Sequence, residues 1–196
     1  MTYAIIGAGH LGMAIAHRFA RSGIAVSIAN SRGPDSISDL VKALGPTVSA
    51  TSLLGALSAE TVILAIPFAA HPTIALSRDH WEGTTVIDAM NFRETSLAPL
   101  DGRQSSDFVA RSFPGAKLVK TFNQLPAALF GSEPAQDGGR RVMFVAGNHH
   151  EANAEVAALV ESLGFSAVVL GSICEGGRLL RFRGPLVLQN LIKHDA

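Results

Sequence analysis

Three glycines near the start of the chain have a spacing that suits the binding of phosphate groups. Gly7, Gly9 and Gly12 follow a short apolar run and precede an alanine-rich segment, which gives the order strand, tight turn and helix. In this arrangement Gly7 allows the turn, Gly9 lets a pyrophosphate approach the backbone, and Gly12 lets helix and strand pack closely. The free N–H groups and the dipole at the start of the helix also favour an anion. The sequence therefore predicts a dinucleotide site, the alternative being a structural glycine turn.

The residues after the second predicted strand, 24–29, indicate which dinucleotide to expect. An NAD site would have an Asp or Glu here, about 20 residues past the glycines, to bind the ribose hydroxyls. This chain has Asn30, Ser31 and Arg32 instead, and its next acid is Asp35. A guanidinium can bind a 2′-phosphate through two hydrogen bonds, and a serine hydroxyl can donate to the same phosphate. These residues favour NADP over NAD, unless Arg32 is an ordinary solvated arginine.

The predicted strand at 60–68 is apolar almost throughout, as expected for a parallel strand covered on both faces. Pro67 stops the hydrogen-bonding ladder at the carboxyl end of this strand, which is the end where ligands bind in such sheets. Ile66, Pro67 and Phe68 are therefore expected to line the nicotinamide ribose or ring. Core packing explains each of these residues nearly as well.

Two later segments are also predicted to be apolar strands, and each is followed by a polar residue at its carboxyl end. A strand with its exit loop is predicted at 84–91, and a further strand at 116–123. They end in Asn91 and Asn123, which should lie on the same edge of the sheet as Pro67.

The alternation of strands and helices predicts an α/β fold. We expect a doubly wound, Rossmann-like domain with a mostly parallel sheet over residues 1–171, and a small C-terminal extension over 172–196. The extension is expected to fold over the cofactor cleft or against a second subunit. The other predicted elements are helices at 10–22, 35–44, 104–112 and 149–163, strands at 141–146 and 165–170, and a loop at 133–140.

Composition narrows the classes of partner. The 16 basic residues balance the 16 acidic ones and form no long run, which argues against a nucleic acid or a membrane as partner. Cys174 is the single cysteine, so no intramolecular disulfide can form and a reducing compartment is the simpler assumption. The seven histidines show no metal-ligand spacing. Without a signal peptide or a long apolar stretch, a cytoplasmic protein is expected.

Taken together, the motifs resemble those of the coenzyme F420-dependent NADP reductase family over nearly the whole chain. The motifs that carry the resemblance are the glycine turn, Asn30–Arg32, Leu64–Pro67, Asp88–Asn91, Lys120–Asn123 and Met143–Gly147. The resemblance implies a Rossmann domain with a small C-terminal extension that binds NADPH and passes hydride to a deazaflavin.

The resemblance also implies roles by position. The implied contacts are Gly7, Gly9, His10 and Leu11 at the pyrophosphate, Ser31 and Arg32 at the 2′-phosphate, Ile66, Pro67, Phe68 and Asn91 near the nicotinamide ribose, and Asn123 beside the ring. Two departures concern the acceptor side. Phe92 stands where the family usually has proline, and Cys174 begins a stretch where small hydroxyl residues are common. The same superfamily includes the NADP-binding part of metalloreductases, which reduce metals through a flavin.

Hydride transfer between two planar heterocycles needs positioning above all, because the cofactors carry the chemistry. We therefore predict no single essential catalytic residue, and we expect Asn123 and Cys174 to contact an acceptor that is F420 or a flavin. Cys174 as a redox nucleophile is an alternative, although a lone cysteine without a basic activator is usually inert. A non-catalytic NADP sensor and a reductase of a small carbonyl compound or metal chelate remain open. A homodimer is expected.

Overall fold

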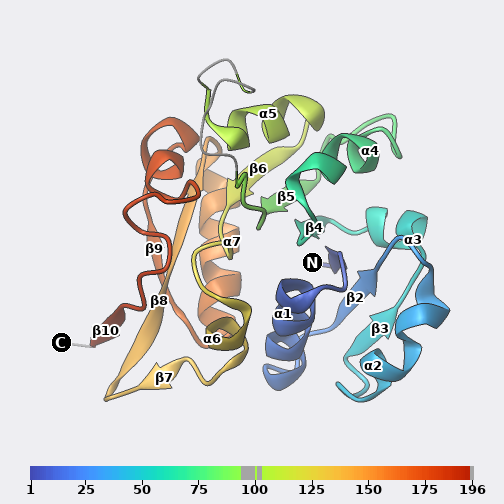
Figure 1. The fold of residues 1–196 in the computed structure, drawn as a ribbon, viewed down its shortest axis with the longest axis horizontal. Helices are drawn as coiled ribbons and strands as arrows, with labels where there is room; N and C mark the ends of the chain where they lie inside the picture. Colours follow the sequence, from blue (N-terminus) through green and yellow to red (C-terminus); the bar gives the residue numbers. More distant parts are fainter. Residues whose placement is uncertain (94–99, 101–102, 195–196) are drawn as a thin grey trace.

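The structure of the chain, a computed structural model, describes residues 1–93, 100 and 103–194. Within these residues, one mixed sheet of ten strands is flanked by helices (Figure 1). The strands are β1 (Tyr3–Ile6), β2 (Val26–Ala29), β3 (Val48–Ala50), β4 (Thr61–Leu64), β5 (Thr85–Asp88), β6 (Lys117–Lys120), β7 (Ala135–Gln136), β8 (Gly139–Gly147), β9 (Ser166–Val169) and β10 (Ile192–His194).

Most of the helices are short, and the first and the last of the α-helices are the longest of those described. The α-helices are α1 (His10–Arg21), α2 (Ser38–Lys42), α3 (Leu53–Leu57), α4 (His71–Ala75), α5 (Ser105–Ser112), α6 (Ala127–Gly131) and α7 (His150–Ser162). Two 3₁₀ turns, Pro34–Ile37 and Phe68–Ala70, and one π-helical turn, Ile173–Gly177, complete the described helical elements. None of the helices in the described part of the chain is long and apolar enough to cross a membrane.

The strand order confirms the predicted fold class. The main path through the sheet is β3-β2-β1-β4-β5-β6-β8-β10, in which the first six strands are parallel and β8 runs antiparallel to β6. Strands β7 and β9 also pair with β8. The predicted extension, 172–196, contributes β10 to the edge of the sheet, and its residues 195 and 196 lie outside the described part.

Helices cover both faces of the sheet. Because successive side chains of a strand point to opposite faces, each central strand contributes to two apolar clusters. Ile5, Ile63 and Ile87 belong to a core cluster with apolar residues of α1, α6 and α7. Val62 and Leu64 belong to a second cluster with residues of α3, α4 and α5. This double burial explains why the central strands are apolar almost throughout.

The predicted loop at 133–140 is wrong in part, because it contains β7 and the start of β8. Asp137 and Gly138 both have positive φ, at +51° and +79°, and they connect the two strands as a two-residue hairpin. Asp-Gly is a strong signal for such a turn. The sequence therefore contained a signal for this hairpin, but the Pro- and Gly-rich composition of the segment favoured the prediction of a loop.

Other boundaries also differ from the predictions. Strand β4 ends at Leu64, and β5 and β6 end at Asp88 and Lys120, so Asn91 and Asn123 lie on the loops that follow. The helix predicted at 35–44 is a 3₁₀ turn followed by α2. The short elements β3, α3, α6 and β10 were not predicted, since they contain too few residues to establish a periodic pattern.

The side chain of Gln124 fills a gap in the sheet between β6 and β10. It is completely buried, and its amide donates to the carbonyl of Val142 at 3.2 Å and accepts from the N–H of Phe144 at 3.0 Å. Both partners belong to β8, so one side chain replaces the ladder that a neighbouring strand would supply there.

Replacing Gln124 by methionine should therefore lower the free energy of unfolding. Methionine has a similar size but would leave the two β8 backbone groups without partners, at a cost of about 1–3 kcal/mol for each buried group. Chemical denaturation would measure the loss. The exposed Gln189 offers a matched control, because Gln189→Met should leave the unfolding curve unchanged. Equal stability of the two variants would contradict the role assigned to Gln124.

Candidate functional site

The order of the strands creates a crevice at the carboxyl ends of β1 and β4. These two strands are neighbours in the middle of the sheet, with β2 and β3 continuing on one side and β5 and β6 on the other. The chain connections therefore turn away from each other at this point, which is where ligands bind in open α/β sheets. The loop after β1 contains the three glycines of the predicted dinucleotide motif.

Two of the three glycines are required by close packing in the structure itself. Gly7 has φ +111°, and a Cβ atom there would lie 2.3 Å from the carbonyl oxygen of Ala65 in the loop after β4. A Cβ atom on Gly12 would lie 1.8 Å from the carbonyl oxygen of Gly7. Gly9 differs, because a Cβ atom there would meet nothing within 4 Å among the described residues. The turn therefore has a rigid base and an open position at Gly9.

The start of α1 is well suited to an anion. Gly9 is the N-cap residue, no described side chain caps the helix, and the first helical hydrogen bond runs from the N–H of Met13 to the carbonyl of Gly9 at 2.9 Å. The N–H groups of His10, Leu11 and Gly12 thus have no partner within the helix. They are left to an external acceptor such as a phosphate, which the helix dipole also favours.

The loop after β2 is ordered by Asn30. Its Oδ1 accepts from the N–H of Arg32 at 3.0 Å, and its Nδ2 donates to the hydroxyl of Ser36 at 2.9 Å. The side chains of Ser31 and Arg32 are exposed, and Arg32 forms no ion pair within the described residues. Asn30 therefore shapes the loop, while Ser31 and Arg32 have free polar atoms.

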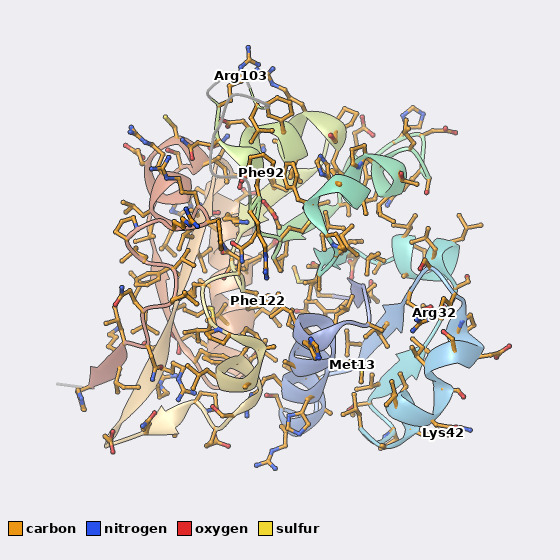
Figure 2. The ribbon with its side chains drawn as sticks, in the orientation of Figure 1. Met13, Arg32, Lys42, Phe92, Arg103 and Phe122 are labelled. Atoms are coloured by element: carbon orange, nitrogen blue, oxygen red, sulfur yellow. The ribbon has the colours of Figure 1, made fainter. Side chains whose placement is uncertain are left out.

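A cavity of about 490 Å³ lies beside the glycine turn. It is lined by Leu11, Ala65, Ile66, Pro67, Phe68, Ala69, Ala89, Met90, Asn91, Phe92 and Arg93. The structure thus brings together the predicted contact residues from α1, the loop after β4 and the loop after β5. In Figure 2, Phe92 lies above α1 and Arg32 lies to the right of it, so the predicted contacts come from two separate loops.

Aromatic side chains form one wall of this cavity. The ring centroids of Phe68 and Phe92 are 4.9 Å apart, and Phe68 also packs on the ring of His71 at 4.6 Å. His71 is buried and its Nδ1 lies 2.5 Å from the carbonyl oxygen of Phe68. Phe92, the departure from the family pattern, therefore contributes a flat apolar surface.

Asn91 and Asn123 hold each other in place. The Nδ2 of Asn91 donates to the carbonyl of Asn123 at 3.1 Å, and the Nδ2 of Asn123 donates to Oδ1 of Asn91 at 3.0 Å. Asn123 also donates to the carbonyl of Leu180 in the C-terminal extension at 2.7 Å. Asn123 is buried and is not part of the cavity lining, so its predicted contact with the acceptor stays a prediction.

A buried ion pair supports the loop that carries Asn91. Asp88 and Lys120 are opposite each other in the register of β5 and β6, with Nζ and Oδ2 3.2 Å apart and both side chains almost fully buried. Asp88 also accepts from the hydroxyl of Ser106 and the N–H of Met90, each at 3.0 Å, and Lys120 donates to the carbonyl of Met90. Burial lowers the pKa of Lys120, and the carboxylate of Asp88 opposes this effect.

This pair was not predicted as part of the site. The sequence did contain a hint of this pair, since each of two apolar strands ends in a charged residue. Charged side chains are rarely buried unless they are paired. The register of the strands, which places the two residues side by side, could not be known from the sequence.

Cys174 lies away from the cavity beside the glycine turn. It is an exposed residue of the π-helical turn Ile173–Gly177, which begins with a capping box between Ser172 and Glu175. Its side chain lines a different cavity, of about 400 Å³, in the C-terminal extension. The predicted contact of Cys174 with the acceptor is untested, and the two predicted acceptor contacts do not share a cavity.

The chain is similar in sequence and in fold to several known proteins. The family model described as NADP oxidoreductase, coenzyme F420-dependent, matches residues 2–92, which contain the glycine turn, the Asn30–Arg32 loop and Asn91. A putative F420-dependent NADP reductase from Arthrobacter sp. FB24 has 28% sequence identity and a TM-score of 0.73, over 89% of this chain and 86% of that one. The chain is similar to this family over residues 2–92, somewhat less than half of its length. It is thus related to NADP-dependent oxidoreductases, and the family match leaves its acceptor open.

Two other similar proteins extend the comparison. A hypothetical protein, SMa0349 from Sinorhizobium meliloti, has 45% identity and a TM-score of 0.93, over 98% of this chain and 96% of that one. The metalloreductase STEAP3 of Rattus norvegicus is 30% identical over 171 residues, which are 86% of this chain and 33% of the rat protein. The chain thus spans about a third of the length of the curated relatives it matches.

Proposed function

We propose that this chain transfers hydride between NADPH and a planar heterocyclic acceptor, either a deazaflavin such as F420 or a flavin. The observation that carries the proposal is the composition of the 490 Å³ cavity beside the glycine turn. Among the described residues that line it, Arg93 is the only titratable one, and Phe68 and Phe92 supply an apolar aromatic wall. Reduction of a carbonyl compound needs a proton donor near the substrate, whereas hydride transfer between heterocycles needs only alignment.

The residues of the site fit NADP(H), whose nicotinamide would supply the hydride. The N–H groups at the start of α1 and the open backbone at Gly9 would hold the pyrophosphate. Ser31 and Arg32 would bind the 2′-phosphate, and Ile66 and Pro67 would pack against the nicotinamide ribose. These interactions would fix the position of the nicotinamide ring, while the apolar wall would exclude water from the space above it.

The acceptor can be tested by NADPH oxidation with a deazaflavin, FMN, a ferric chelate and a small ketone. We expect turnover with a deazaflavin or flavin and none with the ketone. Reduction of the ferric chelate is expected only when a flavin is also present. Turnover of the ketone without any flavin would contradict the proposal, and so would tight binding of NADPH without turnover of any acceptor, which is the behaviour of a sensor.

The choice of NADP over NAD is expected to depend on Arg32. Arg32→Gln removes the charge that would bind the 2′-phosphate, and a lost charge-assisted hydrogen bond of about 1.5–3 kcal/mol weakens binding roughly tenfold or more. Isothermal titration should show weaker NADPH binding and unchanged NADH binding. Arg21→Gln, at the far end of α1, serves as the control. An equal effect of Arg32→Gln on both cofactors would argue against a 2′-phosphate site.

A further inference from the structure

We propose that Ser36 is a positioning residue that sets the preference of this chain for NADP(H) over NAD(H). The hydroxyl of Ser36 holds the side chain of Asn30, and Asn30 in turn holds the backbone of Arg32. Ser36 would thus act on the 2′-phosphate without touching it. This inference rests on the proposed function, because it requires that Arg32 binds the 2′-phosphate, and it adds a residue that was not among the predicted cofactor contacts.

The loop after β2 is fixed in the fold at both ends. At its start, Asn30 follows directly on β2, whose last residue, Ala29, is fully buried. At its end, Ser36 belongs to the 3₁₀ turn Pro34–Ile37, which is anchored in the core by the buried side chain of Ile37. The exposed residues 31 and 32 lie between these two fixed points.

The side chains of Asn30 and Ser36 bridge the two ends. The Oδ1 of Asn30 accepts from the N–H of Arg32 at 3.0 Å, and because that backbone group needs an acceptor, the amide nitrogen is left for Ser36. This nitrogen, Nδ2, donates to the hydroxyl of Ser36 at 2.9 Å. An asparagine that bonds the backbone two residues further on forms a local turn. Ser36 therefore orients the amide group that sets the backbone at Arg32.

The hydroxyl of Ser36 is committed to the loop and not to a phosphate. A serine hydroxyl has a single proton. Within the described residues its acceptors are the carbonyl of Gly33 at 2.7 Å and Oδ1 of Asn30 at 3.2 Å, both of which belong to the loop. Gly33 has φ +89°, a conformation that favours glycine, so the bond to its carbonyl also holds the bend after Arg32. The phosphate is left to Ser31 and Arg32.

These bonds lie wholly within the protein, so they order the loop independently of a cofactor. A loop that is already ordered loses less conformational entropy on binding, which increases affinity. NADPH would benefit from this order, because its 2′-phosphate needs the backbone and side chain of Arg32 in one arrangement. NADH has no such phosphate. Loss of the bridge should therefore weaken the binding of NADPH and not that of NADH.

Ser36→Ala removes the bridge but keeps both predicted phosphate contacts. We expect NADPH to bind roughly threefold to tenfold more weakly, as for one lost neutral hydrogen bond, with NADH binding unchanged in isothermal titration. Ser36→Thr keeps the hydroxyl and should bind NADPH as the wild-type protein does. Ser58→Ala is the matched control, because the exposed Ser58 likewise donates at 2.7 Å to the carbonyl three residues before it, that of Gly55, but does so at the end of α3.

Two further measurements separate positioning from direct contact and from a general structural role. If Ser36 acts through Arg32, the double variant Arg32→Gln/Ser36→Ala should bind NADPH no more weakly than Arg32→Gln alone, whereas independent contacts would multiply their effects. In Ser36→Ala the backbone N–H of Arg32 should also exchange faster with solvent than in the wild-type protein, while the thermal unfolding curves of the two proteins coincide.

The outcomes separate a failure of this inference from a failure of the proposed function. Unchanged NADPH binding in Ser36→Ala, equal losses for NADPH and NADH, or multiplied effects in the double variant would overturn the role of Ser36 and leave the proposed function standing. If Arg32→Gln itself binds NADPH as the wild-type protein does, or if the wild-type protein binds no NADPH, the proposed 2′-phosphate site and this inference are both overturned.

Discussion

Replacing Gly9 by alanine is expected to abolish NADPH binding while leaving thermal stability unchanged. A Cβ atom at Gly9 meets nothing within 4 Å in the described protein, so the fold tolerates it. The backbone conformation of Gly9, with φ −80° and ψ −173°, is also open to alanine. The added methyl would instead occupy the surface that the pyrophosphate approaches. Titration with NADPH and a thermal unfolding curve on the same sample would test both halves of the prediction.

Gly12→Ala is the matched comparison and should behave differently. Its Cβ atom would lie 1.8 Å from the carbonyl oxygen of Gly7, so α1 or the turn must move. We expect a loss of about 1–3 kcal/mol or more of stability, as for other overpacked sites, together with weaker NADPH binding. If Gly9→Ala bound NADPH normally, or if it unfolded as early as Gly12→Ala, the open position at Gly9 would not be a cofactor surface.

The second large effect is expected at the buried pair of Asp88 and Lys120. Asp88→Asn leaves the ammonium of Lys120 without its counter-charge in a buried site, and breaking such a pair costs about 3–5 kcal/mol. The loop that carries Asn91 should also lose its position, because Asp88 and Lys120 both bind the backbone of Met90. The free energy of unfolding and the KM for NADPH would be measured. Asp39→Asn, in the exposed pair with Lys42, should change neither.

The pH dependence of stability gives an independent test of the same pair. Burial lowers the pKa of Lys120 below its ordinary value of 10.5. As the pH rises through the lowered value, the folded protein releases the proton before the unfolded chain does, so stability increases with pH up to about 10.5. The double variant Asp88→Asn/Lys120→Met, with no charge at either position, should lack this increase. If the wild-type protein and the double variant differed in stability by the same amount at every pH in this range, Lys120 would not have a lowered pKa.

The order of the elements and the position of the glycine turn could be predicted because they depend on local patterns. Each of these patterns involves only a few neighbouring residues: the apolar runs, the spacing of the glycines, and the absence of an acidic residue after β2. The same holds for Ile66, Pro67 and Phe68, which the structure places along one cavity with Leu11 and Asn91.

The features that escaped prediction depend on contacts between distant segments. The pair of Asp88 and Lys120 requires the register of β5 and β6, and the role of Gln124 requires the gap beside β8. The burial of Asn123 behind Asn91, and the separation of Cys174 from the first cavity, follow from the path of the extension. The fold class was therefore accessible from the sequence, whereas the acceptor side of the site was not.

The most direct test of the account is the fate of the hydride. NADPH deuterated at the transferred position of the nicotinamide would be mixed with the protein and oxidised deazaflavin. Carbon-bound hydrogen does not exchange with water, so the label is retained on the reduced ring if the transfer is direct. We predict deuterium on the deazaflavin in the wild-type reaction and neither label nor turnover with Gly9→Ala. Oxidation of NADPH without label in the deazaflavin, or the absence of any oxidation with deazaflavin and flavin alike, would contradict the proposed function.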